Sequence, residues 1–485
     1  MTNQVAIERL PTRIPGLDDV LGGGIPELSF NIIAGPPGCG KTTLSHQMMF
    51  AWASPQRPAL YFTVLGEPPL KMLRYQQLYD FFDSSAINRS IFFFNLADEA
   101  ASGNLELVLQ RITDEVEAHK PGFIFVDSFR SIMVATDVAD DPHPSLQQFV
   151  QRLGALLTSW QATTFLIGEY ADVADANPVF TVADGLLWLR QSVQRNSMVR
   201  KLEVMKMRGQ ATRPGLHSYR IGKAGLEVFA YSDLSETQAP EQAPDLRRLS
   251  LGVAGLDDML GGGLPRGYSL LVAGPSGSGK SILAAAFLAE GARCGEAGVI
   301  AAFEQDPRRS RNRQLVDLIH SGKIGMIHSP PGNLSIDEVL VQLMREVQRL
   351  HASRVVIDSL SGLELALAPT YQEDFRESLL RLVTTLTNAG ITVLMTSELE
   401  DRYGDLRFSP YGAAFLTDVI IVQRYVEVDS RLQRMMAVVK VRASAHSDAL
   451  HAFTIDDNGL RVGEVMREQE GLLSGRPTRR HGAAD

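Results

Sequence analysis

The feature that most constrains the fold of this chain is an internal duplication. The segment GLDDVLGGGIP at 16–26 returns as GLDDMLGGGLP at 255–265, and GPPGCGKTT at 35–43 returns as GPSGSGKSI at 274–282, both with the same offset. Shorter matches follow in the same order with slightly different spacing, such as VDS and IDS, then KMR and KVR. A repeated order with small changes in spacing predicts two copies of one domain with loops of unequal length. A chain of 485 residues also exceeds what one ordinary core holds.

A polar segment separates the two copies. It reads AYSDLSETQAPEQAPDLRR and contains two prolines, which is typical of a linker. We therefore expect domains at 1–231 and 249–465, joined by a linker at 232–248. The remaining residues, 466–485, are polar with several arginines and glycines, and we expect them to form a flexible tail.

Short apolar runs alternate with helical patterns in each half. Continuous apolar strands between helices predict a mainly parallel sheet covered on both faces, so the fold class is α/β. The expected strands of the first half are 30–35, 59–64, 91–95, 123–128 and 163–168. The expected elements of the second half are strands at 269–274, 299–304, 354–359 and 391–397, and helices from Lys280, from Pro307, near 337–350 and at 373–388.

Composition narrows the class of protein. The chain is 45% apolar and 21% charged, as in globular proteins, and its net charge of −9 argues against a surface devoted to nucleic acid. Its two cysteines, Cys39 and Cys294, are too few for a disulfide framework and fit a reducing compartment. The N-terminus has no signal-peptide pattern and no apolar run approaches the length of a membrane helix. We therefore expect a cytoplasmic protein with no membrane partner.

Two glycine-rich loops predict nucleotide binding, because segments 35–42 and 274–281 both match G-x-x-x-x-G-K-[ST]. Glycines let successive backbone N–H groups converge on phosphate oxygens, and the following helix presents its positive end. We expect the lysines to reach the β- and γ-phosphates of ATP, and the hydroxyls of Thr42 and Ser281 to bind Mg²⁺. A chance glycine-rich turn is the alternative for one isolated match, and two matches at equivalent repeat positions disfavour it. The expected ATP-binding residues of the loops are Gly35, Gly38, Cys39, Gly40, Lys41, Thr42 and Thr43, then Gly274, Ser276, Gly277, Ser278, Gly279, Lys280, Ser281 and Ile282.

Four acidic residues complete the expected sites. Asp127 and Asp358 each end an apolar strand, beside the loop, where a carboxylate can orient Mg²⁺ and its waters. The alternative for each is a simple strand-end cap. Glu67 and Glu304 follow the second strand of each half and are candidates for the catalytic group that orients or deprotonates water. The alternative for both is an ordinary loop carboxylate.

Basic residues recur late in each half. Lys206 and Arg208, like Lys440 and Arg442, occupy alternate positions of an expected strand and therefore project from one face. Such residues could meet the γ-phosphate of ATP bound to a neighbouring subunit. The alternative is a solvated basic edge that blunts strand pairing.

With these motifs in place, the sequence resembles the KaiC family of circadian-clock ATPases over nearly its whole length. The marks are the two phosphate loops, the GGG-[IL]-P segments before them, and LTDVIIVQRYVE at 416–427 followed by VVKVRASAH at 438–446. The resemblance implies two tandem RecA-like P-loop domains in a two-tiered homohexamer, with ATP at each subunit interface. It also implies that the four late basic residues act on the neighbouring subunit's ATP. His446 matches a nucleotide-contacting histidine of the family, and the first domain has Thr212 in its place.

The chain departs from the family pattern at two places. The family has adjacent glutamates after the second strand, whereas the two halves here have Gly66-Glu67 and Glu304-Gln305. Glutamine keeps hydrogen bonding but cannot accept a proton at neutral pH. The second departure is the phosphorylated Ser-Thr pair of the clock proteins, which falls here on Ala414-Phe415.

Three functions remain open from the sequence. The favoured one is a KaiC-like ATPase whose nucleotide state sets a conformation that a partner reads; the tail is either a docking segment for that regulatory protein or has no partner. The second is an autophosphorylating serine/threonine kinase of the clock type, for which Ser409 and Thr417 are candidate acceptors if they are not structural. The third is a DNA-dependent recombinase or helicase, which needs a basic or aromatic single-strand track. We see no arginine-rich central loop, so nucleic acid is not the expected partner.

Overall fold

The computed structural model forms two compact units, Met1–Tyr231 and Ser232–Asp485, and we describe each separately. None of the helices in the described part of the chain is long and apolar enough to cross a membrane. The expected linker at 232–248 lies outside the described residues except for its last two positions, and most of the expected tail also lies outside them. The structure describes residues 8–64, 69–102, 104–129, 152–156, 159–170, 178–194, 197–230, 247–309, 312–328, 334–372, 375–399, 416–428, 430–456, 459–467, 469–470 and 478–479.

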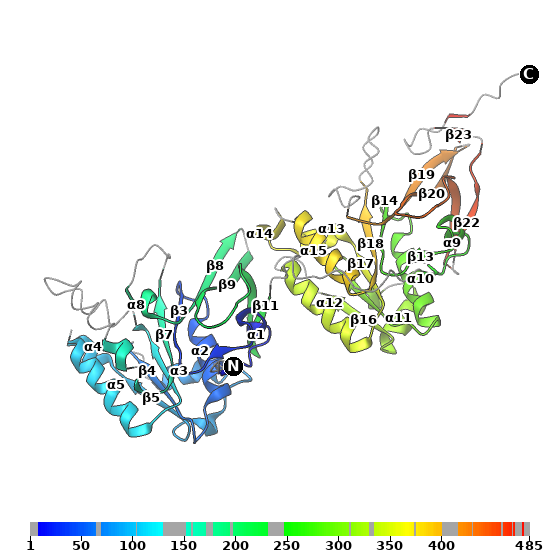
Figure 1. The fold of residues 1–485 in the computed structure, drawn as a ribbon. Helices are drawn as coiled ribbons and strands as arrows, with labels where there is room; N and C mark the ends of the chain where they lie inside the picture. The colour runs from blue at the N-terminus through cyan, green and yellow to red at the C-terminus, as the bar shows by residue number, and fades with distance from the viewer. Residues whose placement is uncertain are drawn as a thin grey trace, which may run out of the picture. The chain divides into compact units, whose positions relative to one another are not determined.

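The first domain is built on a nine-stranded sheet (Figure 1). Its order is β11-β10-β9-β8-β3-β7-β6-β4-β5, with parallel pairing from β8 to β5 and antiparallel pairing from β8 to β11. The parallel strands are short buried apolar runs, as expected for a sheet covered on both faces. The strands are β3 (Phe30–Gly35), β4 (Ala59–Thr63), β5 (Ile91–Asn95), β6 (Phe123–Asp127), β7 (Thr163–Glu169), β8 (Gly185–Gln194), β9 (Ser197–Met207), β10 (His217–Gly222) and β11 (Gly225–Phe229).

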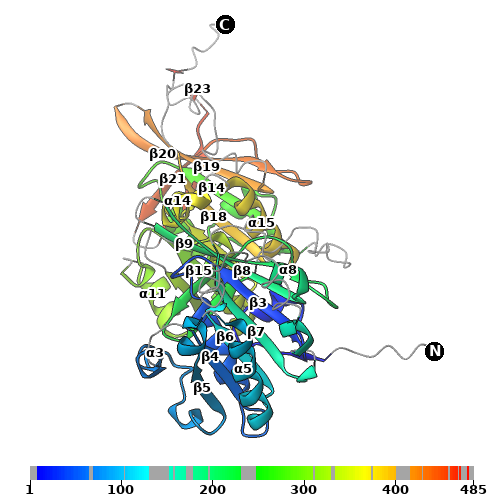
Figure 2. The same ribbon diagram turned by 90° about the vertical axis from the view of Figure 1, so that its left-hand side faces the viewer.

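Two hydrophobic layers cover this sheet. One contains α1 (Leu17–Leu21) and α2 (Lys41–Trp52), and the other contains α4 (Ala97–Ala101), α5 (Leu105–His119) and α8 (Pro178–Val182). Figure 2 shows β6, β4 and β5 side by side with α5 against them. The remaining elements are β1 (Arg9–Leu10), β2 (Ile25–Pro26), α3 (Pro69–Gln76) and the 3-10 helix η1 (Ser84–Ala86).

The second domain repeats this plan with the order β16-β15-β17-β18-β14-β19-β20-β21-β22. Pairing is parallel from β16 to β19 and antiparallel from β19 to β22. The strands of this sheet are β14 (Ser269–Gly274), β15 (Gly298–Ala302), β16 (Ile324–His328), β17 (Arg354–Asp358), β18 (Thr392–Glu398), β19 (Val419–Val428), β20 (Arg431–Val441), β21 (His451–Asp456) and β22 (Gly459–Val465). Two-stranded pairs join β12 (Arg248–Leu249) to β13 (Leu264–Pro265) and β23 (Gln469–Glu470) to β24 (Thr478–Arg479).

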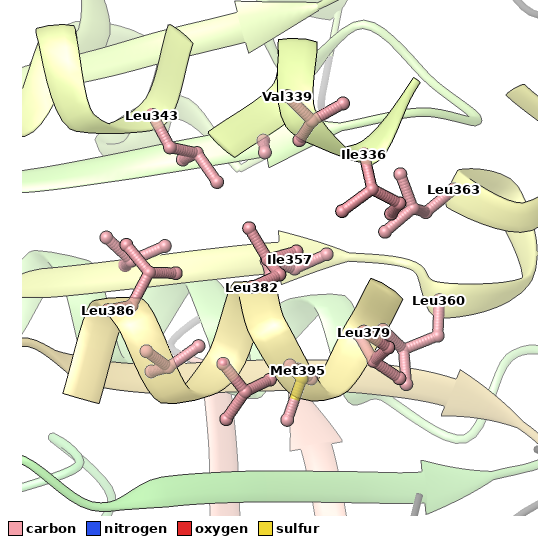
Figure 3. Packing of buried hydrophobic residues seen from close by; sticks show 14 of the residues in the cluster. Ile336, Val339, Leu343, Ile357, Leu360, Leu363, Leu379, Leu382, Leu386 and Met395 are labelled. Atoms are coloured by element: carbon pink, nitrogen blue, oxygen red, sulfur yellow. The ribbon is translucent and has the colours of Figure 1, made fainter. Parts of the chain in front are cut away.

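Helices again cover both faces of the second sheet. One layer holds α9 (Leu256–Met259), α10 (Lys280–Arg293) and α11 (Arg313–His320); the other holds α12 (Ile336–Leu350), α13 (Leu360–Ala366) and α15 (Phe375–Asn388). Figure 3 shows Leu343 of α12 and Leu382 of α15 directed toward Ile357 of β17. The short helix α14 (Pro369–Gln372) precedes α15.

The expected helix from Pro307 is interrupted. The chain forms a 3-10 turn, η3 (Pro307–Arg309), and α11 begins only at Arg313. The side chain of Asn312 accepts a hydrogen bond from the backbone N–H of Leu315, so it caps a new helix there. The apolar strands, in contrast, lie where the sequence predicts them.

A β-bulge occurs at the same place in both domains. In the β8–β9 hairpin Leu186 pairs with Lys206 while Leu187 pairs with Val204, so Met205 is the extra residue. In the β19–β20 hairpin the register shifts equivalently between Ile420 and Ile421. Each bulge therefore immediately precedes the lysine of the KMR or KVR segment.

Candidate functional site

The first phosphate loop joins β3 to α2 and depends on glycine. Gly38 has φ +76°, and a Cβ built there would meet no atom within 4 Å, so this side of the loop is open. Gly40 has φ +100°, and a Cβ there would lie 2.4 Å from the side chain of Ile221. A side chain is strained at both positions because φ lies in the left-handed region. No side chain caps the N-terminus of α2, which leaves its first N–H groups available to an anion.

The second loop, between β14 and α10, has the same geometry. Gly277 and Gly279 have φ values of +77° and +108°, and no side chain caps α10 at Lys280. The two loops therefore have equivalent geometry, each at the carboxyl edge of a parallel sheet, with an uncapped helix start that suits an anion.

The first cavity, of about 450 Å³, opens at this loop. It brings together five of the expected ATP-binding residues and Asp127 from the end of β6. Its lining also includes residues that the sequence did not single out, among them Tyr79 and Arg200, the second of which comes from β9. The lining residues are Gly38, Gly40, Lys41, Thr42, Thr43, Tyr79, Asp127, Ser128, Glu169, Arg200 and Ile221.

Asp127 is held by hydroxyl donors. The Thr42 hydroxyl donates to its Oδ2 atom at 2.8 Å, and the Tyr61 hydroxyl donates to the same atom at 2.7 Å. Burial raises the pKa of the Asp127 carboxyl, and these two hydrogen bonds oppose that shift. The ammonium of Lys41 donates to the carbonyl of Pro36 at 2.9 Å, on the loop itself.

The second cavity, of about 320 Å³, brings together expected residues of the loop, the metal site and the catalytic site. Lys280 and Ser281 come from the loop, Asp358 from the end of β17, and Glu304 from the segment after β15. Glu398, at the end of β18, is a carboxylate that the sequence did not single out. The lining residues are Ser276, Gly277, Gly279, Lys280, Ser281, Ile282, Ile300, Ala302, Glu304, Gln305, Asp306, Pro307, Leu315, Asp358, Ser359 and Glu398.

Lys280 contributes a buried ammonium group to this cavity. Its ammonium donates to the carbonyls of Gly274 at 2.9 Å and Pro275 at 2.8 Å. Burial lowers its pKa, and the carboxylates Glu398, Asp358 and Glu304 oppose the shift. A phosphate entering the cavity would supply further negative charge to a cation that is only partly solvated.

Neighbouring residues fix the position of the Glu304 side chain. The Ser359 hydroxyl donates to its Oε1 atom, and the same hydroxyl accepts the Gly362 N–H at 3.0 Å, which caps α13. A Cβ at Gly362 would lie 2.6 Å from Cγ of Glu304, so the close approach needs glycine. The carboxylate is thereby held at the cavity wall.

Not every expected loop residue lines a cavity. Cys39 is buried, with its Sγ atom 4.0 Å from the ammonium of Lys41, and Ser278 is buried and donates to Gln423 at 3.0 Å. These two side chains therefore support the loops from the protein interior. Gly35 and Gly274 are the last residues of β3 and β14 and lie outside the cavity linings.

The late basic residues do not line the cavities of their own domains. Arg208 pairs with Asp184 and Arg442 with Asp418, each at 3.1 Å. Lys206 donates to the carbonyl of Thr181 at 3.1 Å and Lys440 to that of Thr417 at 2.5 Å. Lys206 and Arg208 therefore contact residues just before β8, and Lys440 and Arg442 contact residues just before β19. His446 is exposed, and Thr212 is half-buried.

Some expected residues cannot be placed. Glu67 and Gly66, and also Ser409, Ala414 and Phe415, lie outside the described residues. Thr417 is described, and its side chain is fully buried.

Comparisons with known proteins agree with this architecture. The family described as "ATPase: KaiC" matches residues 10–233 and again residues 249–467. The chain is 26% identical to the circadian clock oscillator protein KaiC of Picosynechococcus sp. over 487 residues, covering 98% of this chain and 93% of that protein. It is 26% identical over 487 residues to the circadian clock oscillator protein KaiC 1 of Synechocystis sp., covering 98% and 92%. Because the family matches each of the two α/β domains along almost its full length, the chain belongs to the KaiC family.

Proposed function

We propose that the chain binds Mg²⁺ and ATP in each domain and hydrolyses the ATP. The observation that carries this proposal is the second cavity, where a phosphate loop, a loop lysine and hydroxyl, a strand-end aspartate and a supported glutamate surround one space. Structural lysines and acids rarely converge in this way, whereas a nucleotide site requires all of them. The first cavity offers the same loop, lysine, hydroxyl and aspartate.

Each residue has a role in this chemistry. The loop N–H groups and Lys280 bind the β- and γ-phosphates, and Glu304 orients water for attack on the γ-phosphorus while the bond to the ADP oxygen breaks. The oxygens of Ser281 and Asp358 suit Mg²⁺, which prefers hard oxygen ligands shared with phosphates. When bound, Mg²⁺ neutralises charge that develops on the phosphate oxygens. In the first site we assign the corresponding roles to the loop residues and Asp127, and the water-orienting role to Glu67.

The assembly is also part of the proposal. Because the late basic residues and His446 lie away from the cavities of their own domains, we assign them to ATP held by a neighbouring copy in a homohexamer. We further propose a clock-type signalling role, in which a regulatory protein reads the nucleotide state through the tail at 466–485. Family membership supports the hexamer and a cytoplasmic location. We assign no autokinase role to Thr417, since its side chain is buried, and the other candidate acceptor, Ser409, lies outside the described residues.

The direct test counts nucleotides. We expect the wild-type chain to bind two ATP molecules, and Lys41→Ala and Lys280→Ala chains to bind one each, because each change removes the loop cation of one site. Equilibrium dialysis with radiolabelled ATP gives the count, and gel filtration with and without ATP gives the assembly. Lys323→Ala, at an exposed position of the second domain, is the matched control. Unchanged stoichiometry in both loop variants would remove the proposed sites.

A further inference from the structure

The two strand-end aspartates are each held by a hydroxyl that lies outside the phosphate loop. In the first domain the Tyr61 hydroxyl donates to Oδ2 of Asp127 at 2.7 Å. In the second domain the Thr396 hydroxyl donates to Oδ1 of Asp358 at 2.5 Å. Asp127 and Asp358 occupy the same register position in the two sheets, so the two hydrogen bonds serve the same carboxylate.

The hydroxyls come from opposite sides. Tyr61 lies on β4, one neighbour of β6, whereas Thr396 lies on β18, which corresponds to the other neighbour. The position equivalent to Tyr61 in the second sheet is Ile300, which pairs with Val356 as Tyr61 pairs with Phe125.

The exchange is reciprocal. Thr396 pairs with Val272 of β14, and Ile167 pairs with Ile33 of β3 at the equivalent position. Ile167 has no hydroxyl. Of these two strand positions, each domain therefore keeps a hydroxyl donor at one, and neither domain keeps the donor that the other uses.

Packing fixes the direction of the Tyr61 hydroxyl. The side chain is fully buried, and its ring lies 4.6 Å from the His46 ring in an edge-on arrangement and 5.4 Å from the Phe93 ring. His46 lies one helical turn after Thr42 on α2, so both residues face the same side of that helix. One face of α2 thus supplies the loop hydroxyl and also the wall that holds the tyrosine.

We propose that Tyr61 and Thr396 are positioning residues that orient the Mg²⁺-facing carboxylates of the first and second sites. The proposal rests on the function proposed above, since it assumes that the two aspartates serve Mg²⁺. A carboxylate that rotates freely presents its oxygens to the metal only part of the time, and partners that orient a ligand strengthen metal binding. Tyr61 and Thr396 act on the metal step and do not touch the phosphates.

The test measures Mg²⁺ dependence at one site at a time. In full-length Lys280→Ala chains, which keep the first site, a fluorescent ATP analogue is titrated in EDTA and then at increasing Mg²⁺. We expect Tyr61→Phe to raise the Mg²⁺ concentration for half-maximal tight binding roughly tenfold. We expect affinity in EDTA to stay within about twofold, because metal-free binding depends on the loop. Added Ile167→Thr should restore the original Mg²⁺ dependence by supplying the hydroxyl from the other strand.

The second site provides the reciprocal measurement. In full-length Lys41→Ala chains, Thr396→Val should raise the Mg²⁺ requirement similarly, whereas Tyr61→Phe should leave it unchanged. This arm also stands if Tyr61→Phe fails to fold, which tryptophan fluorescence would reveal.

The outcomes separate the two proposals. An unchanged Mg²⁺ requirement in folded Tyr61→Phe and Thr396→Val chains overturns the positioning role, and so does an equal loss of affinity with and without Mg²⁺. Failure of the Lys280→Ala and Lys41→Ala parents to lose any nucleotide would instead overturn the proposed function.

Discussion

His46 gives the first domain a stability that depends on pH. It is fully buried on α2 beside Tyr61 and Phe93, and burial lowers its pKa from 6.5 to about 4, with the Gln76 side chain opposing the shift. In the unfolded chain the His46 side chain therefore takes up a proton near pH 6.5, whereas in the folded chain it stays neutral until about pH 4. Stability from this residue is complete above pH 6.5 and falls as the pH drops from 6.5 toward 4.

The magnitude follows from these two pKa values. Linkage gives a loss of about 1.4 kcal/mol at pH 5.5 and about 2.5 kcal/mol at pH 4.5, relative to pH 7.5. Acidic side chains add their own pH dependence, so the wild-type curve alone does not isolate His46. We therefore compare the wild type with His46→Met, because methionine fills irregular apolar space without a titrating group. The other nine histidines are common to both proteins.

The chain carries its own reporter for this experiment. All three tryptophans, Trp52, Trp160 and Trp188, are in the first domain, so urea unfolding followed by tryptophan fluorescence reports on that domain. The difference in unfolding free energy between the two proteins should shift by about 2.5 kcal/mol between pH 7.5 and 4.5, in favour of the variant at low pH. Parallel curves, with a difference that stays within about 0.5 kcal/mol at every pH, would refute a buried neutral His46.

Three further changes test the second domain. Glu304→Gln in the Lys41→Ala chain should lower single-turnover ATP hydrolysis by about 10² or more with ATP binding retained, and an unchanged rate would assign the water-orienting role elsewhere. Gly362→Ala should also slow hydrolysis, because its Cβ would displace Glu304; the Mg²⁺ titration should not move, and a shift there would contradict this reason. Leu382→Ala, at a fully buried position, should lower the free energy of unfolding by about 3 kcal/mol in urea followed by circular dichroism, and a cost below about 1 kcal/mol would show that the core collapses around the gap.

Much of the fold could be predicted from the sequence, because its signals are local. The buried strands are continuous apolar runs, and glycine, lysine and hydroxyl residues at fixed spacing identify the two phosphate-loop motifs. Asp127 and Asp358 were found for the same reason, since each directly ends such a run. The break between Pro307 and Arg313 was missed because an asparagine cap is a weak signal within a charged segment.

The parts of the sites that the sequence missed come from distant elements. Arg200 lines the first cavity from β9, and Tyr79 reaches it from the segment after α3. The hydrogen bonds of Tyr61 and Thr396 depend on which strands are neighbours and in which register. Strand order and register are set by the whole fold, and a single sequence considered by itself does not indicate them directly.

The paired bulges impose a limit on how these hairpins can change in length. Met205 is an extra residue inserted ahead of Lys206, and side chains alternate between the faces of a strand. Paired residues of an antiparallel ladder share a face, so Lys206 lies on the face of Leu186, opposite to the face of Val204 and Leu187. Deleting Met205 would even the ladder and leave Lys206 paired with Leu186, so the lysine would keep its face. A one-residue deletion within the evenly paired part of β9 would instead shift the register on one side of the gap and turn those side chains to the opposite face. Single-residue changes in this arm should therefore be tolerated at the bulge and poorly tolerated away from it.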